Sequence, residues 1–291
     1  MIELRVLGSG SSGNCALVTS ARARLLIDAG LSAKQIVLRL EAAGIDPGSL
    51  DGIVVTHEHG DHVRGLDVFC KKFGVPLFCT RLTLEALRYI LKSPDEKCWK
   101  LIPGAGQFAV GDLEVTTFPV PHDAVDPIGM VVRAGGAALG VVSDVGFVTS
   151  VMRDHLADID LLFLEANYDE QLLLQDTKRP WPTKQRISAR HGHLSNTQVA
   201  ECLVEIASAR LQHVVLGHLS EDCNQPDLAA SSARRALESA GFGAIAVICA
   251  ERKAASACIQ VRPPARPLPA RERAEWVAAL PDRPFAQAEL W

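Results

Sequence analysis

The stretch VVTHEHGDH, residues 54–62, constrains this chain more than any other. It places four side chains that commonly bind metals within six residues: His57, His59, Asp61 and His62. Neutral imidazole nitrogens and carboxylate oxygens are the ligands that borderline divalent cations prefer. In an extended strand end the first two histidines share one face, and Gly60 permits a sharp turn that returns the last two side chains to the same place. We therefore expect this segment to contribute to two adjacent metal sites; the alternative is a solvated polar loop.

The bulk composition is that of an ordinary soluble globular protein. Of 291 residues, 48% are hydrophobic and 22% are charged, which fits one large domain or two small ones. The formal net charge of −4 gives no general attraction to nucleic acid, so binding of a polyanion requires a local basic patch or bound metal ions. The chain has no signal-peptide pattern, no apolar run of about 18 residues, and no C-x-x-C pair among its eight cysteines. These features predict a cytoplasmic protein without membrane contact.

Apolar strands that end in His or Asp recur along the chain. The strands expected at 51–55, 113–118, 137–142 and 213–217 are followed by the 57–62 segment, His122, Asp144 and His218, respectively. Because the strand ends of one sheet lie close together, residues distant in sequence converge on one edge. The pattern favours an α/β fold, a two-sheet sandwich with a single metal site on its rim. The alternatives are turn residues at His122 and Asp144 and a core histidine at His218.

The remaining helices and strands are predicted from the spacing of apolar residues and from the glycine, proline and capping residues between them. The clearest helix is 32–43, whose apolar residues recur at helical spacing before Gly44, and Ser195 is placed to cap another at 195–209. Further helices are expected at 63–73, 82–91 and 226–240, and further strands at 2–7, 15–20, 23–28, 75–79, 98–102, 107–110, 127–133, 161–164, 244–249 and 256–261. Residues 175–194 look like a loop. A proline-rich linker begins at Arg262, which predicts a folded domain at 1–262 and a tail at 263–291 with a short helix around 271–279.

The chain resembles the metallo-β-lactamase fold superfamily through the pattern His57-x-His59-x-Asp61-His62 and the later His122, Asp144 and His218. Within that superfamily it resembles the bacterial YycJ/WalJ-type group of 5′→3′ DNA exonucleases, over residues 1 to 262. This likeness rests on the segments GSGSSGN (8–14), SDVG (143–146), EANYD (165–169), PWPTKQRI (180–187), GHLSN (192–196) and LGHLS (216–220). One departure is Tyr168, where the group usually carries His, and the sequence leaves the role of this position open.

The resemblance implies a four-layer αββα sandwich and phosphodiester hydrolysis with two divalent metal ions, for which zinc, manganese and iron all suit the ligands. By the pattern of the superfamily, one ion is held by His57, His59 and His122, the second by Asp61, His62 and His218, and Asp144 bridges them. Such a pair polarises a phosphate oxygen and converts a shared water into an attacking hydroxide near neutral pH. Asp61 is a candidate to accept the proton of that water. Asp61 and Asp144 are thus the expected catalytic carboxylates.

DNA is the expected substrate, ahead of RNA, and the sequence leaves the oligomeric state open. Two other functions are alternatives. One is a hydrolase on the same scaffold that acts on a small phosphodiester, a thioester or a lactone. The other is a metal-stabilised regulatory protein without turnover, against which the complete ligand set argues. The basic run at 178–190 favours a polyanionic substrate.

Substrate contacts are expected from three segments. In the Gly/Ser loop they are Ser11, Ser12 and Asn14, with a plain connector as the alternative. Lys184 and Arg186 belong to five cations in the 178–190 run, which has no acidic residue and includes Trp181. Phosphate binding with base stacking is the functional interpretation, and a solvated basic loop is the alternative. His193, Ser195 and Asn196 lie at a helix N-terminus that suits an anion, with ordinary capping as the alternative.

Overall fold

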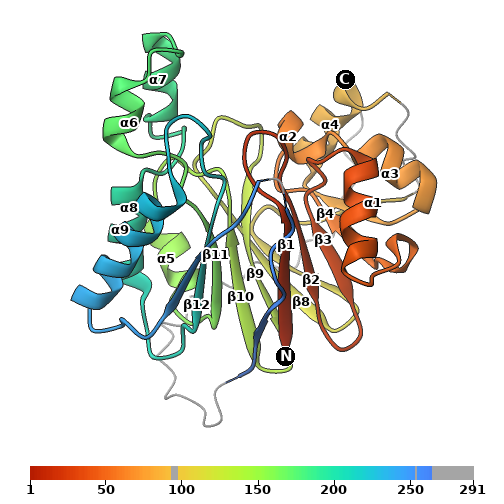
Figure 1. Ribbon diagram of the computed structural model, residues 1–291. Coiled ribbons are helices and arrows are strands. Elements are labelled where there is room, and N and C mark those ends of the chain that lie inside the picture. Colours follow the sequence, from red (N-terminus) through yellow and green to blue (C-terminus); the bar gives the residue numbers. More distant parts are fainter. Residues whose placement is uncertain (93–97, 253, 264–291) are drawn as a thin grey trace, which may run out of the picture.

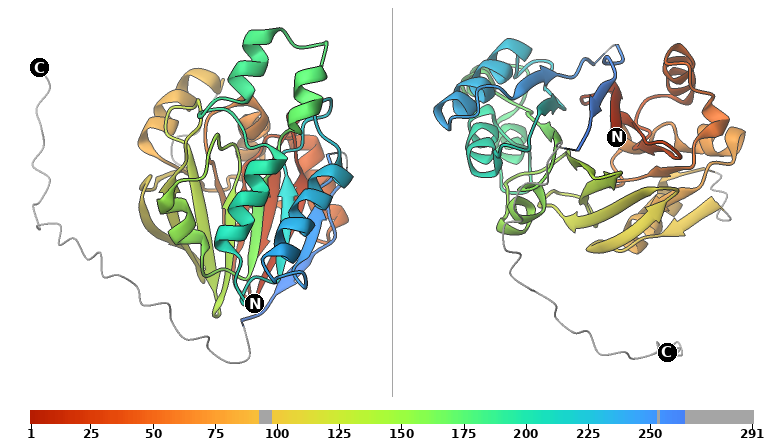
Figure 2. Two further views of the ribbon diagram at one scale, coloured as in Figure 1. Left: turned by 90° about the vertical axis from the view of Figure 1, so that its left-hand side faces the viewer. Right: turned by 90° about the horizontal axis from the view of Figure 1, so that it is seen from below.

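Two β-sheets packed face to face form the centre of the molecule, and helices cover their outer faces (Figures 1 and 2). The computed structural model describes residues 1–92, 98–252 and 254–263. In spatial order, the first sheet consists of β14 (Ile259–Val261), β1 (Ile2–Gly8), β2 (Cys15–Thr19), β3 (Arg24–Ile27), β4 (Gly52–Val54), β5 (Leu77–Cys79) and β6 (Trp99–Leu101). The second consists of β13 (Ala246–Cys249), β12 (His213–Gly217), β11 (Leu161–Glu165), β10 (Ala137–Val142), β9 (Ile128–Ala134), β8 (Leu113–Pro119) and β7 (Gly106–Val110).

The helices form the two outer layers. The first sheet is covered by α1 (Ala33–Ala42), α3 (Leu66–Phe73) and α4 (Arg81–Ile90), and the second by α5 (Ser150–Leu156), α8 (Asn196–Ile206) and α9 (Pro226–Ser239). The short α2 (Gly60–Val63) lies at the upper edge of the sheets in Figure 1, which we call the upper rim. At the other side of the same view, α6 (Glu170–Gln175) and α7 (Trp181–Ile187) extend above this rim. A 3₁₀ turn, η1 (Pro47–Ser49), follows α1. The expected αββα sandwich is confirmed.

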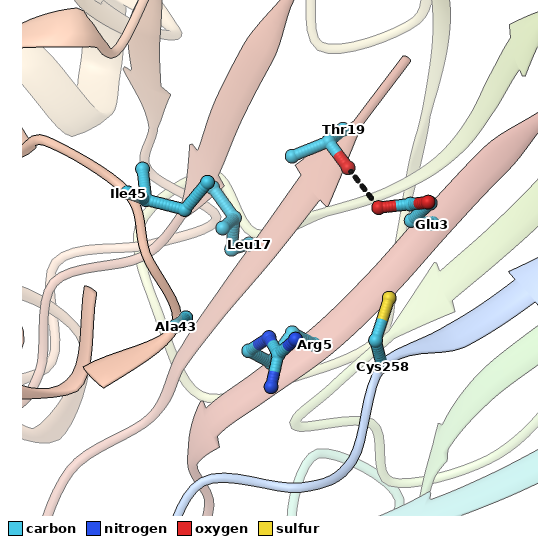
Figure 3. Close-up of a pocket in the computed structure, with 7 residues that line it drawn as sticks. All are labelled: Glu3, Arg5, Leu17, Thr19, Ala43, Ile45 and Cys258. Carbon is cyan, nitrogen blue, oxygen red and sulfur yellow. Dashed lines mark hydrogen bonds between the residues drawn. The ribbon is translucent and has the colours of Figure 1, made fainter. Parts of the chain in front are cut away.

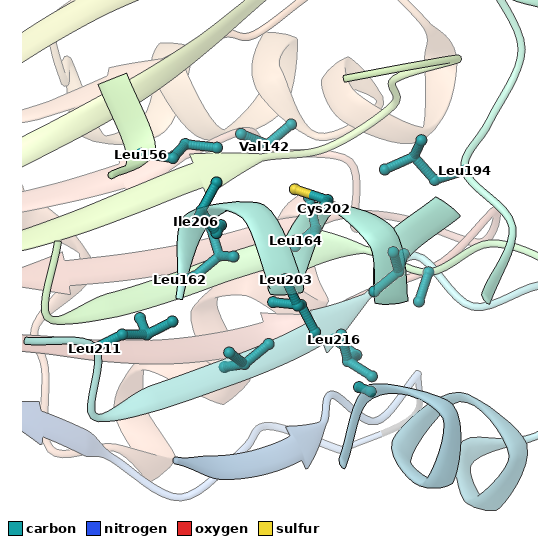
Figure 4. Packing of buried hydrophobic residues seen from close by; sticks show 14 of the residues in the cluster. Val142, Leu156, Leu162, Leu164, Leu194, Cys202, Leu203, Ile206, Leu211 and Leu216 are labelled. Atoms are coloured by element: carbon teal, nitrogen blue, oxygen red, sulfur yellow. The ribbon is translucent and has the colours of Figure 1, made fainter. Parts of the chain in front are cut away.

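Both faces of the central strands are buried, which explains their continuous apolar runs. In β10, Leu139 and Val141 belong to the cluster between the sheets, whereas Ala138 and Val142 belong to the cluster under the helices. The alternation follows from the period of two along a strand. Figure 4 shows this outer cluster, where α8 packs Leu203 and other side chains against the second sheet. A third cluster joins the first sheet to α1 and α3.

Parallel pairing brings the ends of three strands to the upper rim. The strands β10, β11, β12 and β13 are parallel, with Val142 beside Leu164 and Leu164 beside Leu216. The polypeptide leaves β10, β11 and β12 at the same edge of the sheet. The residues that follow these three strands are therefore neighbours in space. This register positions Asp144 and His218 beside Glu165.

The loop predicted for residues 175–194 is wrong, because α7 occupies Trp181–Ile187. Its two prolines are compatible with the helix: Pro180 is the N-cap and Pro182 lies in the first turn, where a missing N–H breaks no helical hydrogen bond. The helix expected at 63–73 begins later, as α3 at Leu66, and Val63 instead ends the separate α2. At Gly65, between them, a Cβ atom would lie 2.3 Å from the backbone oxygen of Leu31, so the chain packs closely there. The sequence reading also missed α5 and α6.

The expected tail, apart from its first residue, lies outside the described residues, as does the helix expected around 271–279. The division into a domain at 1–262 and a tail at 263–291 therefore stays a prediction. Within the described part of the chain, we find no helix with the length and apolar character that a membrane span requires.

Candidate metal centre

Three histidines form the first half of a cluster at the upper rim. His57 and His59 follow β4, and His122 follows β8 on the other sheet. The His122 Nε2 and His59 Nδ1 atoms are 3.3 Å apart, and the His57 ring centroid lies 4.7 Å from that of His59 and 5.1 Å from that of His122. Their ligand atoms, together with one from Asp144, all lie within 4.8 Å of one another. The three imidazoles are thus arranged as a single cation would need them.

Asp61, His62 and His218 form the second half. Asp61 and His62 lie on α2, and His218 follows β12. The Asp61 Oδ2 atom is 3.4 Å from His218 Nε2 and 3.6 Å from His62 Nε2. The term His/Asp cluster is used below for seven residues: His57, His59, Asp61, His62, His122, Asp144 and His218. All seven expected ligands therefore meet at one place.

Asp144 stands between the two halves. Its Oδ2 atom is 3.6 Å from His57 Nε2, 3.6 Å from His122 Nε2 and 3.4 Å from His62 Nε2, while its Oδ1 atom contacts His218 Nδ1. The side chain is 2% exposed, so neighbouring groups rather than water must balance its charge. This position is the one that a bridging carboxylate would occupy.

Backbone strain is concentrated at the same site. Among the described residues, the non-glycine positions with positive φ are Asp28 (58°), Asp144 (52°) and His218 (51°). A left-handed conformation costs a non-glycine residue of order 1–3 kcal/mol, and such strain gathers at functional sites where the surroundings enforce it. Gly60, by contrast, has no positive φ and no atom close to the position of its missing Cβ. The turn after His59 therefore does not require glycine, which corrects that expectation.

Two buried carboxylates outside the cluster orient its members. Asp28 Oδ2 is 2.8 Å from His62 Nδ1, and the Asp28 carboxylate also accepts hydrogen bonds from the N–H and hydroxyl groups of Thr56. Glu165 Oε1 is 2.6 Å from His193 Nδ1 and 3.2 Å from His218 Nδ1. Such contacts fix the ring orientation of a ligating histidine. Sequence reasoning missed Asp28, although it directly follows β3 and obeys the same strand-end rule.

The electrostatics divide the histidines into two classes. Burial lowers the pKa of His57 well below its usual value, with His62 adding to the effect, and burial also lowers the pKa of His122. Burial alone would lower the pKa of His62 too, but Asp144 and Asp28 raise it to about 10. The pKa of His218 is raised well above its usual value, because Asp144 outweighs burial. Without metal, His57 and His122 are thus neutral at pH 7, whereas His62 and His218 hold protons.

The chemistry of the donors fits divalent cations. His57 Nε2 is buried and has no hydrogen-bond partner within the described residues, an arrangement that is costly unless a ligand completes it. The imidazole and carboxylate donors suit zinc, manganese or iron. His122 Nδ1 donates to the Gly192 carbonyl oxygen at 3.0 Å, which leaves its Nε2 free to face the cluster.

The Gly/Ser loop reaches the cluster through Asn14. The Asn14 side chain is buried, and its Nδ2 atom lies 3.1 Å from Asp61 Oδ2 and 3.0 Å from His62 Nε2. Ser9 Oγ accepts a hydrogen bond from the backbone N–H of His218. Ser11 and Ser12 are exposed at the tip of the loop. The loop therefore contacts the second half of the cluster, with two hydroxyl groups facing solvent.

The basic run has acidic partners that the sequence did not reveal. Arg186 Nε is 2.5 Å from Asp123 Oδ2, Arg179 pairs with Asp176 and Asp222, and Lys178 pairs with Asp222. These pairs correct the picture of five cations without acidic neighbours. Lys184 donates to the Leu174 carbonyl oxygen, and the Arg190 guanidinium lies 4.0 Å from the centroid of the Phe147 ring. No described carboxylate pairs with either of these two residues.

The three residues expected at the α8 N-terminus have different surroundings. The His193 ring centroid lies 5.2 Å from that of His122 and 5.3 Å from that of His218, so His193 borders the cluster. The Ser195 hydroxyl accepts from the Gln198 N–H in a capping box. The Asn196 side chain is buried and exchanges hydrogen bonds with Asn224. Of the three, His193 is the one that borders the cluster.

Tyr168 lies beneath the α6–α7 pair and not in the cluster. It is buried with Leu173 and Cys223, and Ile187 packs against them. Burial raises the pKa of its hydroxyl to about 12. The position at which the group usually carries His therefore serves packing in this chain.

A separate hollow of about 70 Å³ lies on the outer face of β1 and β2 (Figure 3). Its lining includes Glu3, Arg5 and Cys258 but none of the seven cluster residues. The Glu3 carboxylate already accepts hydrogen bonds from Thr19 and Gln260. This hollow has no convergent set of free polar groups, and we assign the chemistry to the His/Asp cluster.

Comparisons with known proteins agree with this geometry. The family model described as a beta-lactamase superfamily domain matches residues 23–218. The chain is 33% identical to exodeoxyribonuclease YycJ of Bacillus anthracis, covering 83% of this chain and 91% of the relative. It is 34% identical to exodeoxyribonuclease WalJ of Streptococcus pneumoniae, covering 82% and 89%. The metallo-beta-lactamase fold protein YhfI of Bacillus subtilis shares the fold, with a TM-score of 0.65 and 16% identity over 88% of this chain and 98% of that one. The chain therefore belongs to the β-lactamase superfamily and, within it, to the family of the exodeoxyribonucleases YycJ and WalJ.

Proposed function

We propose that this protein is a metal-dependent exodeoxyribonuclease that degrades DNA from the 5′ end. The observation that carries the proposal is the convergence of five histidines and two aspartates, from loops of both sheets, around the buried Asp144 carboxylate. The family membership supports the choice of DNA, since the relatives at 33% and 34% identity are named exodeoxyribonucleases. The eight cysteines are free thiols, which suits the reducing cytoplasm where DNA is found.

The proposed centre holds two divalent ions, zinc, manganese or iron. One would be bound by His57, His59 and His122, the other by Asp61, His62 and His218, with Asp144 shared. When bound, such a pair supplies Lewis acidity toward the phosphate and lowers the pKa of water at the site. This set is the one that the superfamily pattern implies. The spacing of the donor atoms supports it, since His57, His59, His122 and Asp144 lie together and Asp61 lies near both His62 and His218.

Asp61 is placed to hold a proton during the reaction. Burial would raise the pKa of this carboxyl group, but contacts with His218 and His62 lower it, so Asp61 is ionised at neutral pH. Asn14 Nδ2 holds the Asp61 Oδ2 atom from one side, and the side chain stays 20% exposed. An ionised, partly exposed carboxylate at the cluster edge can accept a proton from an attacking water.

His193 supplies a positive group beside the site of phosphate binding. Burial would lower the pKa of this imidazole, but Glu165 raises it above its usual value. Because Nδ1 faces Glu165, Nε2 is the atom left for a phosphate oxygen. Ser11, Ser12, Lys184 and Arg186 are further proposed contacts to the strand, whereas the cap at Ser195 and the amide pair of Asn196 already occupy those two side chains.

The test is hydrolysis of 5′-labelled single-stranded and duplex DNA by metal-free protein reloaded with Mn²⁺ or Zn²⁺. The wild-type protein is expected to release labelled mononucleotides, and Asp61→Asn to lose about 100-fold or more of that rate. Glu41→Gln, an exposed change on α1, is the matched control and should leave the rate unchanged. Release from 3′-labelled ends first would reverse the proposed polarity. Equal rates for wild type and Asp61→Asn, or turnover of bis-p-nitrophenyl phosphate without any cleavage of DNA, would contradict the nuclease assignment.

A further inference from the structure

The Gly/Ser loop, which joins β1 to β2, is wedged between two segments that carry ligands of the second half of the cluster. On one side, Asn14 contacts the side chains of Asp61 and His62, and its backbone N–H donates to the Asp61 carbonyl oxygen at 2.7 Å. On the other side, the Ser9 hydroxyl accepts from the backbone N–H of His218 at 2.7 Å. The loop therefore has a defined place beside this half of the cluster.

The tip of this loop is a tight turn that exposes two hydroxyl groups. The Gly13 N–H donates to the Gly10 carbonyl oxygen at 2.9 Å, so Ser11 and Ser12 occupy the two central positions. Both serines are exposed, and no hydrogen bond to another described residue engages either hydroxyl. Gly10 and Gly13 adopt φ values of 126° and 148°, a region that favours glycine. The tip therefore projects only the two serine side chains.

Arg252 lies against one end of the turn. A Cβ atom at Gly10 would lie 3.1 Å from Arg252 Cγ and 3.5 Å from the Leu219 carbonyl oxygen. The arginine stem and the residue that follows His218 therefore both border the turn. Arg252 Nη1 is buried and has no hydrogen-bond partner within the described residues, since the Glu221 carboxylate, at 3.7 Å, is too distant. A buried guanidinium nitrogen without a partner is costly unless a ligand completes it.

Arg64 lies at the other end of the turn. It is the C-cap of α2, the helix that carries Asp61 and His62, and its Nη1 atom donates to the Ser12 carbonyl oxygen at 2.8 Å. Arg64 is exposed, and no carboxylate of the described residues pairs with it. Because a guanidinium group has five N–H donors, this single hydrogen bond leaves most of them available to a ligand.

The groups around the turn match a phosphodiester. Two guanidinium groups and two hydroxyl groups, all hydrogen-bond donors, border the same turn, whose ends lie within about 7 Å of each other. Arginine binds phosphate oxygens through paired N–H donors, and its positive charge repels metal cations. The Glu221 side chain is 74% exposed, so its attraction to Arg252 is weak and a phosphate can replace it.

We propose that Arg64 and Arg252 clamp one backbone phosphate of the bound DNA over the turn at residues 10–13. The proposal rests on the proposed nuclease function and adds a second phosphate-binding subsite, beside the second half of the cluster. Such a clamp neutralises charge without reading bases, so it holds strands of any sequence. By holding a neighbouring phosphate, it positions the bond to be cleaved at the metal centre.

The experiment measures kcat/KM for a labelled DNA duplex at a series of KCl concentrations with the metal-loaded, full-length protein. Arg64→Gln and Arg252→Gln, which keep much of the aliphatic stem, should each lower kcat/KM about tenfold at low salt. Each should also reduce the slope of log(kcat/KM) against log[KCl] by about 1, because one phosphate contact is lost. Arg64→Lys and Arg252→Lys keep the charge and should keep most of the slope. A merely structural role would leave the slope unchanged.

Arg22→Gln is the matched control, because it removes the same charge at the opposite end of β2, in the turn before β3, where Arg22 is 78% exposed. It should behave as the wild type. An unchanged slope in Arg64→Gln or Arg252→Gln, or an equal drop in Arg22→Gln, would overturn the proposal. Because Arg64 is exposed, Arg64→Gln decides the outcome even if Arg252→Gln does not fold.

If the wild type cleaves no DNA, the nuclease assignment fails, and equilibrium binding of the same duplex to the full-length protein decides the clamp by itself. There, about tenfold weaker binding and a smaller salt slope in Arg64→Gln support the clamp. Equal binding by the wild type and Arg64→Gln, or no binding by the wild type, rules it out.

Discussion

At the scale of single residues, the cluster depends on groups that never touch a metal. Asp28 is buried, adopts a φ of 58°, and holds His62 Nδ1 at 2.8 Å. With its proton on Nδ1, His62 presents Nε2 to the cluster. Asp28 thereby selects both the tautomer and the orientation of one proposed ligand.

Asp28→Asn is expected to weaken metal binding about 10- to 100-fold, because the ring loses a charged acceptor that orients it. Asparagine tolerates a positive φ nearly as well as aspartate, so the backbone strain stays similar. Metal content after dialysis against a graded chelator series provides the measurement, with Glu41→Gln as control. If Asp28→Asn keeps both metals up to the same chelator concentration as the wild type, this role is contradicted.

The protonation states predict a pH dependence of metal binding. His62 has a pKa raised to about 10, and His218 is raised well above its usual value, so both carry protons at pH 7 in the metal-free protein. A histidine must lose its proton to bind a metal through that nitrogen. Full loading should therefore release roughly two protons per protein at pH 7, and affinity should rise with pH below the raised pKa values.

Calorimetric titration in two buffers of different ionisation enthalpy measures that release directly. His57 and His122, whose pKa values are lowered, are neutral already and should contribute little. The equivalent of metal that binds His57 and His122 should then release few protons from them, and the equivalent that binds His62 and His218 should release most. Equal release for both equivalents, or none, would show that the two halves of the cluster do not differ in this way.

At the scale of elements, helix starts decide what several polar residues do. Ser195 caps α8 with both hydrogen bonds of a capping box present. Sequence reasoning placed the same serine at a substrate phosphate, with capping as the alternative, and the structure shows the hydroxyl engaged by the helix. The two roles make opposite predictions for a serine-to-alanine change.

Ser195→Ala is expected to lower the free energy of unfolding by about 1 kcal/mol through loss of the cap, with KM for DNA unchanged within twofold. Urea unfolding and steady-state kinetics on the same preparation measure the two quantities. Ser188→Ala in the exposed segment after α7 is a suitable comparison, since its hydroxyl bonds only to carbonyl groups of the preceding turn. A large rise in KM with no loss of stability would assign Ser195 to the substrate instead.

At the scale of the whole molecule, the cluster joins the two sheets. His57, His59, Asp61 and His62 come from the segment after β4 of the first sheet, whereas His122, Asp144 and His218 follow strands of the second. Metal bound between them would tie together two layers that otherwise meet through apolar side chains.

Chelation is therefore expected to lower the Tm. Each ion present at 100 times its Kd stabilises the folded state by about 2.7 kcal/mol, which for a domain of this size corresponds to roughly 5–10 °C. Thermal unfolding with and without a chelator measures the shift, and Asp144→Asn should show a much smaller one. A wild-type Tm that does not respond to the chelator would mean that metal does not link the sheets.

The sequence by itself determined the ligand types and their positions at strand ends, because these depend on local patterns. Short apolar runs bounded by turn residues favour strands, and His or Asp at the end of such a strand is expected at a sheet edge. The αββα architecture and the meeting of all seven residues followed from this rule together with the family resemblance, and Asp28 obeys the same rule, although it was overlooked.

Only the tertiary structure decided how the charged side chains pair and where α6 and α7 lie. Lys178 and Asp222 are 44 residues apart, and Arg186 and Asp123 are 63 apart, so no local pattern connects them. The orientation of His62 by Asp28 and of His193 by Glu165 likewise spans 34 and 28 residues. Ion pairs and ring orientations depend on which surfaces pack together, and packing is a property of the whole chain. For that reason the sequence predicted the cluster, while the partners that orient it became visible only in the folded molecule.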